Sequence, residues 1–502
     1  MEDLDVNISI MKGDKLFNEN IPFVINIYVP EPKNLKIRSN ADLICVIDIS
    51  RSMAGDKINL VKKSLKALVN IMEETDRICI ILFNHSAKNF FNLNYLTKEI
   101  KNKLNNIIDN IKAEGGTNIM DGLEIAVDVL KNVKDKENQK RASSIILLSD
   151  GCDNNFNDYE LAQKLRDLTK SKDLNFTLNS FGYGGDHDPQ TLKKLSNIRD
   201  GTFFYVDKYE KVAEYFGIVL GTCASVISNK ASLVVELLNK NCEIKKIFGE
   251  EYLYNIDKAL NYFSTSMLQF IYGKEFTYVL EFELKINEVK EGEDLILVDF
   301  MYQDSESGFH KKGLTYKYTL DDKNKNKANK EYVRSQVYDV IDKSLDLKRN
   351  SQKEEAKTVL DEMKNWLVDN KQIYQDNNSE NLFLNDINLA LVYYNNNNNN
   401  NNYISNNNNN ISNNINNCSD KYGFETKAES NIESAITCRV MSNMKKNSSD
   451  PHNIYTNKRQ DYYSSSSRKF MYPYRNESYP KYMEEFKKTR NINYKKKKCV
   501  IF

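Results

Sequence analysis

Two short apolar runs, each followed by an aspartate, constrain the fold of this chain most strongly. Residues 43–47 are Leu-Ile-Cys-Val-Ile and precede Asp48, and residues 145–148 are Ile-Ile-Leu-Leu and precede Ser149 and Asp150. Continuous apolar runs of this length are typical of strands that are buried on both faces of a parallel sheet. Both aspartates are therefore expected at the carboxyl ends of such strands, where open α/β folds bind their ligands.

Helical and strand patterns alternate between residues 37 and 229, which predicts an α/β fold with a doubly wound parallel sheet. The expected helices cover residues 57–72, 100–111, 119–130, 159–168, 190–195 and 210–225, and further strands are expected at residues 77–83, 175–181 and 201–206. No Gly-x-Gly-x-x-Gly motif opens the first helix, so a dinucleotide-binding fold is disfavoured.

Five side chains at this edge of the sheet could bind one divalent cation: Asp48, Ser50, Ser52, Thr117 and Asp150. The first three lie in one run of five residues, and Thr117 follows two glycines just before an expected helix. Hydroxyl and carboxylate oxygens are ligands that Mg²⁺ prefers, and two carboxylates balance its charge. The alternative is that these side chains only cap turns and the helix that follows. We predict a Mg²⁺ site, which Mn²⁺ or Ca²⁺ could also occupy, with one position open to a carboxylate of a partner protein.

The order Asp-x-Ser-x-Ser, Thr and Asp resembles the metal-ion-dependent adhesion site (MIDAS) of von Willebrand factor A domains, and the resemblance covers residues 37–229. It implies that Ser50 and Ser52 bind the ion directly, that Thr117 binds directly or through water, and that Asp48 and Asp150 act mainly through water. Arg51 stands where the family often has Gly, which leaves the ligands intact and places a cation beside the site.

Histidine 187 lies in a loop that also follows an expected strand, Gly-Tyr-Gly-Gly-Asp-His-Asp-Pro at residues 182–189. The density of Gly, Asp and Pro favours a turn in which His187 is exposed to solvent. His187 is therefore not assigned to the metal site.

Composition excludes several classes of function. The net charge is +1, so no overall field attracts nucleic acid. The first residues lack the pattern of a signal peptide, and no run of eighteen apolar residues occurs, so the chain is expected to be neither secreted nor membrane-spanning. The eight cysteines have no Cys-x-x-Cys spacing, which argues against a zinc site or a disulfide framework.

The sequence ends with Lys495, Lys496, Lys497 and Lys498, followed by Cys499-Val-Ile-Phe at residues 499–502. A cysteine, two aliphatic residues and a last Phe match the CaaX signal for prenylation, here geranylgeranylation. One lipid chain binds a membrane only marginally, so a second signal is needed. Four lysines next to an anionic leaflet would supply it. We predict a lipid-anchored protein on the cytoplasmic face of a membrane, with a cytosolic fraction.

The regions around the metal domain differ from it in pattern. Alternating apolar residues in segment 1–36 and several strand-like runs in segment 230–322 predict one antiparallel β-sandwich into which the α/β domain is inserted. Segment 323–393 is expected to be helical, with a capping box at Ser351 and Glu354 and with apolar stripes that form a core. Segment 394–498 is rich in Asn and is predicted to be a disordered tail.

The order of domains resembles a eukaryotic family that carries a von Willebrand A domain and C-terminal strand and helix regions. Some plant members have a RING finger and act as ubiquitin ligases, but this chain has no Cys/His cluster for the RING zincs. We predict a Mg²⁺-dependent protein-binding module on a membrane-tethered recruitment protein, and no enzyme. The alternatives are substrate recruitment for a ubiquitin ligase and, less favoured, a metal-dependent hydrolase.

Overall fold

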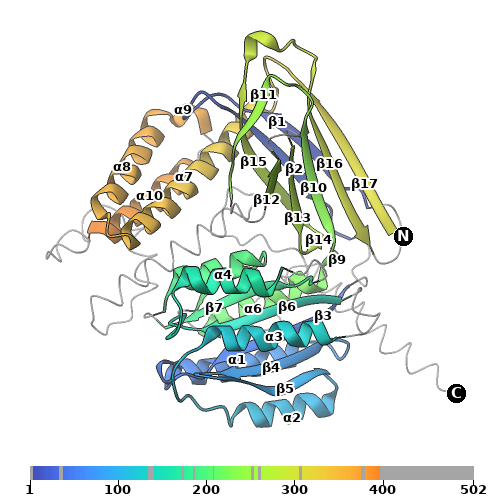
Figure 1. The fold of residues 1–502 in the computed structure, drawn as a ribbon, viewed down its shortest axis with the longest axis vertical. Coiled ribbons are helices and arrows are strands. Elements are labelled where there is room, and N and C mark those ends of the chain that lie inside the picture. The colour runs from blue at the N-terminus through green and yellow to red at the C-terminus, as the bar shows by residue number, and fades with distance from the viewer. Residues whose placement is uncertain are drawn as a thin grey trace, which may run out of the picture.

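The computed structural model describes residues 4–32, 38–133, 141–170, 174–184, 187–206, 209–249, 254–257, 262–304, 308–374 and 379–395. Figure 1 shows three parts: a sheet flanked by helices, a sandwich of antiparallel strands above it, and a group of helices beside the sandwich. Cys499, the four lysines before it and nearly all of the predicted disordered tail lie outside the described residues. None of the described helices has the length and apolar composition needed to cross a bilayer.

The helix-flanked part is built on a six-stranded sheet in the order β5-β4-β3-β6-β7-β8. Its strands are β3 (Asn40–Asp48), β4 (Arg77–Phe83), β5 (Ala87–Tyr95), β6 (Arg141–Ser149), β7 (Thr177–Tyr183) and β8 (Phe203–Val206). All neighbouring strands are parallel except β4 and β5. The two apolar runs form the central strands β3 and β6, and residues such as Ile47 and Leu148 are fully buried. The predicted doubly wound parallel sheet is confirmed.

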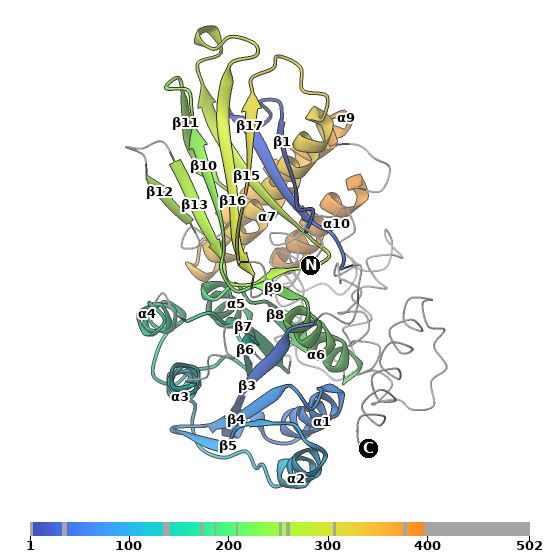
Figure 2. The ribbon, with the colours of Figure 1, turned by 90° about the vertical axis from the view of Figure 1, so that its right-hand side faces the viewer.

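Helices cover both faces of this sheet, as Figure 2 shows from the side. One core lies beneath α1 (Asp56–Ile71), α2 (Lys98–Ile108) and α6 (Tyr209–Ala224). The other lies beneath α3 (Ile119–Asn132), α4 (Asp158–Leu168) and α5 (Pro189–Ile198). Side chains of β3 alternate between the two cores, because Leu43 and Ile47 face one and Ile44 and Val46 face the other.

Strand β5 was not predicted from the sequence. Phe90 and Leu93 lie in this edge strand, which pairs antiparallel with β4 and precedes the expected helix over residues 100–111. The residues of β5 are exposed or only partly buried, and the pairing contains two register irregularities. An exposed, irregular edge strand has little of the alternation from which strands are inferred.

The sandwich unites segments from both sides of the α/β domain. One sheet has the order β1-β2-β15-β11 and the other has the order β12-β13-β10-β16-β17. Their bounds are β1 (Asn7–Lys12), β2 (Ile21–Val29), β10 (Ala231–Leu237), β11 (Cys242–Ile247), β12 (Tyr254–Asp257), β13 (Tyr262–Met267), β15 (Lys274–Leu284), β16 (Asp294–Asp304) and β17 (Gly308–Lys317). A small pair, β9 (Val226–Ser228) with β14 (Phe270–Ile271), lies below them. Because β2 pairs with β15, the predicted insertion of the α/β domain is confirmed.

The last part consists of α7 (Lys325–Arg349), α8 (Lys353–Asp369), α9 (Lys371–Tyr374) and α10 (Ser379–Asn395). The predicted apolar stripes, including Val337, Ile341 and Leu360, form its core. The predicted capping box is wrong: Ser351 has a φ of +64°, and the residue before α8 is Gln352, which makes no side-chain cap. Helix α10 also runs two residues into the predicted tail, where Tyr394 is buried.

A buried ion cluster fastens the amino-terminal edge of the six-stranded sheet. Asp42 on β3 accepts hydrogen bonds from Arg77 Nε on β4 at 2.8 Å and from Arg141 Nε on β6 at 2.7 Å. All three side chains are buried, and both guanidinium groups lie beside the ring of Tyr95. One carboxylate therefore links the three central strands at the edge opposite Asp48.

Replacing Asp42 with Ala leaves two buried cations without their carboxylate, so we expect the free energy of unfolding to fall by about 3–5 kcal/mol. The measurement is urea unfolding of the full chain. The control is Asp109→Ala, which removes an exposed ion pair with Lys66 and should cost less than about 1 kcal/mol. Equal losses in the two variants would contradict a special role of the cluster.

Candidate metal site

The candidate site lies where the adjacent parallel strands β3 and β6 end. The register pairs Ile47 with Leu148, so Asp48 and Asp150 leave the sheet at the same edge. Both side chains are buried, with 0% and 1% of their residue surfaces exposed. Two carboxylates so close together and so far from solvent favour a cation between or beside them.

The carboxylate of Asp48 is fixed from two directions. Its Oδ1 accepts the backbone N–H of Ser50 at 2.8 Å, and its Oδ2 accepts the hydroxyl of Ser149 at 2.7 Å. Burial, the largest effect, and the charge of Asp150 raise the pKa of Asp48 to about 6, although the hydrogen bonds from Ser50 and Ser149 lower it. Each carboxylate oxygen keeps a lone pair for a further donor, such as a water bound to a metal ion.

The hydroxyl oxygens of Ser50 and Ser52 are 3.0 Å apart. Two adjacent ligands of an octahedral Mg²⁺, each at about 2.1 Å from the ion, are separated by about 3.0 Å. Ser50 is buried whereas Ser52 is exposed, so the pair lies at the boundary between the sheet and solvent. The observed spacing thus fits two neighbouring positions in one coordination shell.

The alternative that the serines cap a helix is not supported. Ser50 precedes a short 3₁₀ helix, η1 (Arg51–Met53), but its side chain makes no cap hydrogen bond. Helix α1 starts at Asp56, and the residue before it is Gly55. Asp48 and Asp150 do have the local role that this alternative assigned to them, because their carboxylates accept the backbone N–H groups of Ser50 and Cys152.

Thr117 is brought to the site by hydrogen bonds between three loops. Arg51 donates its backbone N–H to Gly115 O at 3.0 Å, which joins the serine loop to the loop of Thr117. Thr117 donates its N–H to Asn154 Oδ1 at 2.7 Å and accepts the N–H of Asn154 at 3.1 Å, which joins it to the loop after Asp150. All five predicted residues therefore belong to one connected group of loops.

Lys57 on α1 reaches the same site. Its Nζ is 3.2 Å from Asp150 Oδ2, and its side chain is only 16% exposed. The ammonium group places one positive charge beside this carboxylate. The sequence did not identify Lys57, Ser149 and Asn154 as residues of the site. Each is recognised only from its contact in the folded protein with Asp150, Asp48 or Thr117, respectively.

The prediction that His187 is exposed is wrong. Only 3% of its surface is exposed, and its ring stacks on Tyr205 with 5.0 Å between centroids. Its Nδ1 is 2.6 Å from Gly184 O, and burial lowers its pKa. Two aromatic residues of β8, Phe203 and Tyr205, cover the imidazole.

The chemistry of these donors fits a hard divalent cation. The group offers two carboxylates and three hydroxyls, and it contains no soft sulfur ligand. Across the described part of the chain, no three His, Cys, Asp or Glu side chains gather as a metal cluster. The oxygen atoms of these five side chains, at the ends of β3 and β6, are the candidate ligands for such an ion.

Comparison with known proteins identifies similar proteins for the α/β part of the chain. Residues 42–217 match the model of the von Willebrand factor type A domain. Mouse inter-alpha-trypsin inhibitor heavy chain H2 is 30% identical over 206 residues, which cover 39% of this chain and 20% of that protein. An uncharacterised Synechocystis protein is 29% identical over 198 residues, which cover 39% of this chain and 44% of that protein. The chain thus spans less than half the length of these curated relatives.

A solved structure resembles more of the chain. A von Willebrand factor type A protein from Catenulispora acidiphila superposes with a TM-score of 0.60 and 14% identity, covering 77% of this chain and 89% of that one. At this identity the likeness concerns the fold alone. Together with the match to the family model, it establishes that residues 42–217 of this chain form a von Willebrand factor type A domain.

Proposed function

We propose that the mouth of the von Willebrand A domain binds Mg²⁺ and, through it, a carboxylate of a partner protein. The observation that carries the proposal is the pair of hydroxyl oxygens of Ser50 and Ser52, 3.0 Å apart and next to the fixed carboxylate of Asp48. Ser50, Ser52 and Thr117 would hold the ion, with Asp48 and Asp150 acting mainly through water. The bound ion would supply a Lewis-acidic position for the incoming carboxylate.

A binding function agrees better with the residues at the mouth than hydrolysis does. His187, in the loop that follows β7, is buried against Tyr205 and therefore cannot act as a base that reaches a substrate. We therefore propose a module for recruiting proteins and not an enzyme. Recruitment of substrates to a ubiquitin ligase is one process that such a module could serve.

Mg²⁺ should stabilise the native protein, since a ligand that binds only the folded state adds about 2.7 kcal/mol at a hundred times its Kd. We expect the melting temperature to rise with Mg²⁺ and to return with EDTA. Thr117→Ala and Asp48→Ala should abolish the shift, whereas Asp128→Ala, at an exposed acid on α3, should retain it. An undiminished shift in both site variants would refute metal binding at this mouth.

Arg51 should select partners with a second acidic group. It lies between Ser50 and Ser52, its side chain is exposed, and Lys57 already balances part of the charge of Asp150. With a dication bound, one partner carboxylate would leave positive charge at the mouth. A second acidic side chain could pair with Arg51, which is worth about two- to five-fold in affinity at an exposed site.

The test compares peptides with one and with two acidic residues by fluorescence polarisation in Mg²⁺. Arg51→Gly should weaken binding of the diacidic peptide and leave the monoacidic peptide unchanged. The control is Lys103→Gln, which removes one exposed charge on α2. An equal loss of affinity for both peptides in Arg51→Gly would show that Arg51 does not bind the second acidic side chain.

We also propose that the protein is tethered to the cytoplasmic face of a membrane. The sequence at residues 495–502 supports this proposal. The CaaX signal acts only at a C-terminus, so the proposal applies to the chain that ends at Phe502. A prenyl group on Cys499 and about 1 kcal/mol from each of the four lysines would together hold the protein at an anionic leaflet.

Cys499→Ser should move a fusion with an N-terminal fluorescent protein from membranes to the cytosol, because the thiol is the site of prenylation. Cell fractionation and microscopy measure the change. Cys418→Ser, which alters a cysteine in the same tail, is the matched control and should leave localisation unchanged. If Cys499→Ser stays at the membrane, the prenyl tether is refuted.

A further inference from the structure

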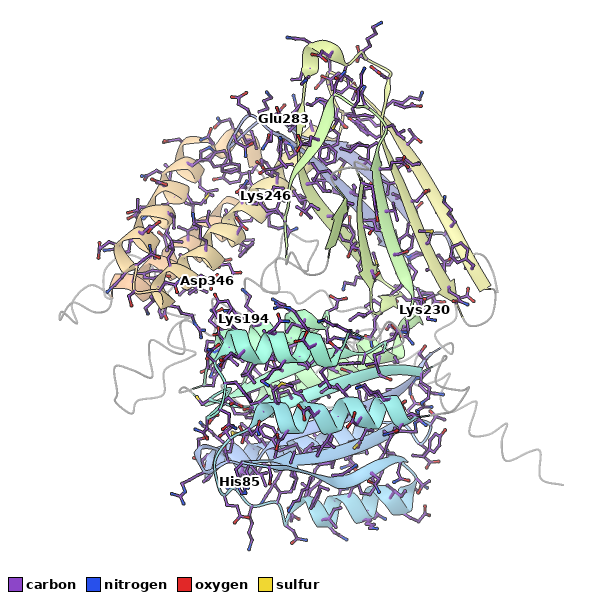
Figure 3. All side chains as sticks on the ribbon, viewed as in Figure 1. His85, Lys194, Lys230, Lys246, Glu283 and Asp346 are labelled. Carbon is purple, nitrogen blue, oxygen red and sulfur yellow. The ribbon has the colours of Figure 1, made fainter. Side chains whose placement is uncertain are left out.

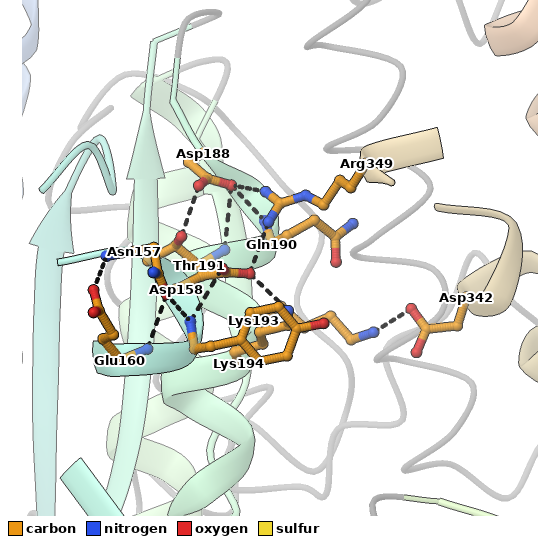
Figure 4. Close-up of polar contacts among 11 residues, drawn as sticks. Asn157, Asp158, Glu160, Asp188, Gln190, Thr191, Lys193, Lys194, Asp342 and Arg349 are labelled. Carbon is orange, nitrogen blue, oxygen red and sulfur yellow. Dashed lines mark hydrogen bonds and ion pairs between the residues drawn. The ribbon is translucent and has the colours of Figure 1, made fainter. Parts of the chain in front are cut away.

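The end of helix α7 contacts the von Willebrand A domain through charged side chains. Arg349, the last residue of α7, donates to Asp158 Oδ2 at 2.8 Å and also pairs with Asp188 (Figure 4). About two turns earlier on the same helix, Asp342 pairs with Lys193 of α5. Two cations and three carboxylates thus join the helical part to the helices α4 and α5.

Neighbouring charges reinforce this contact on the domain side. Lys194 of α5 lies 2.6 Å from Asp158, which therefore accepts from two cations. Figure 3 places Asp346 of α7 beside Lys194 across the contact, and their charges interact. The Asp158 side chain is only 12% exposed, whereas that of Arg349 is 32% exposed.

Asp188 connects this contact directly to the proposed metal site. Its backbone N–H donates to Asp150 O at 2.7 Å. Its carboxylate caps α5 by accepting from the N–H groups of Gln190 and Thr191. Gly151, with a φ of +76°, is packed so closely that an added Cβ would lie 2.8 Å from Asp188 O. A shift of Asp188 must therefore move the loop that carries Asp150.

The exposure of Arg349 argues against a purely structural role. Ion pairs that are about one third exposed contribute little to folding stability. The fork of a guanidinium group, however, fixes the direction of the two carboxylates that it joins. Arg349 is thus suited to hold the position of Asp188 with little effect on the stability of the fold.

We propose that Arg349 is a positioning residue for the metal loop, acting through Asp188 on Asp150, so that docking of α7 and metal binding favour each other. The coupling to metal binding rests on the proposed function, whereas the positioning of the loop by Arg349 does not. Linkage requires the effect to be reciprocal: if docking tightens metal binding, the metal must tighten docking by the same factor. The helical part is then a regulator of the binding mouth.

Metal affinity is the first measurement, made by calorimetric titration of the full chain with Mn²⁺. Arg349→Met should weaken binding about five-fold or more, within the usual range of coupling between two sites. Arg349→Lys, which keeps the charge but loses the fork, should give an intermediate Kd. The control is Lys246→Gln, which breaks a pair with Asp339 on the sandwich side of α7 and should bind Mn²⁺ like the wild type.

Hydrogen exchange is the second measurement, and it tests in metal-free protein whether Arg349 holds the position of Asp188. In metal-free protein, the amide of Asp188 should exchange faster in Arg349→Met than in the wild type or in Lys246→Gln. In the wild type, Mg²⁺ should slow exchange in the last turns of α7. Circular dichroism should show that all variants retain the fold.

The outcomes separate the two proposals. Unchanged Asp188 exchange together with an unchanged or tighter Kd in Arg349→Met overturns the role of Arg349. If the wild-type protein binds no Mn²⁺, the proposed metal function fails and the coupling to metal fails with it. In that case the exchange of the Asp188 amide still decides whether Arg349 positions the loop.

Discussion

The parallel pairing of β3 with β6 is the constraint on which the candidate site depends. Because these two buried strands end side by side, Asp48 and Asp150 share one low-dielectric edge, and the charge of Asp150 raises the cost of charging Asp48. Such a pair is unfavourable unless donors or a cation compensate it. The Ser50 amide, the Ser149 hydroxyl and the Lys57 ammonium do so in part, and a divalent ion would complete the compensation.

The sequence allowed the centre of the domain and the proposed ligands to be predicted because both depend on local patterns. Runs buried on both faces have a clear signature, and Asp48, Ser50 and Ser52 lie within a few residues of one another. Thr117 and Asp150 could be added because parallel strands bring their carboxyl ends to one edge. The same reasoning predicted that the sandwich is built from segments on both sides of the domain.

Features that depend on tertiary contacts could not be predicted in this way. The loop of His187 has the composition of an exposed turn. The His187 side chain is nevertheless buried, because it packs against aromatic residues of β8. Ser351 and Glu354 match a capping box in spacing, although the chain reverses through a positive φ at Ser351 and the helix starts later. Arg349 meets Asp188 only because α7 docks on α5, and nothing local to either residue indicates that contact.

Metal binding by Ser50 and Ser52 can be tested by anomalous diffraction from crystals of the protein grown with Mn²⁺. One strong anomalous peak is expected within bonding distance of both Ser50 Oγ and Ser52 Oγ, at the carboxyl ends of β3 and β6. The peak should disappear in Thr117→Ala or become much weaker. Crystals with an ordered mouth and no peak there, or with Mn²⁺ bound only elsewhere, would show that these serines do not bind the ion.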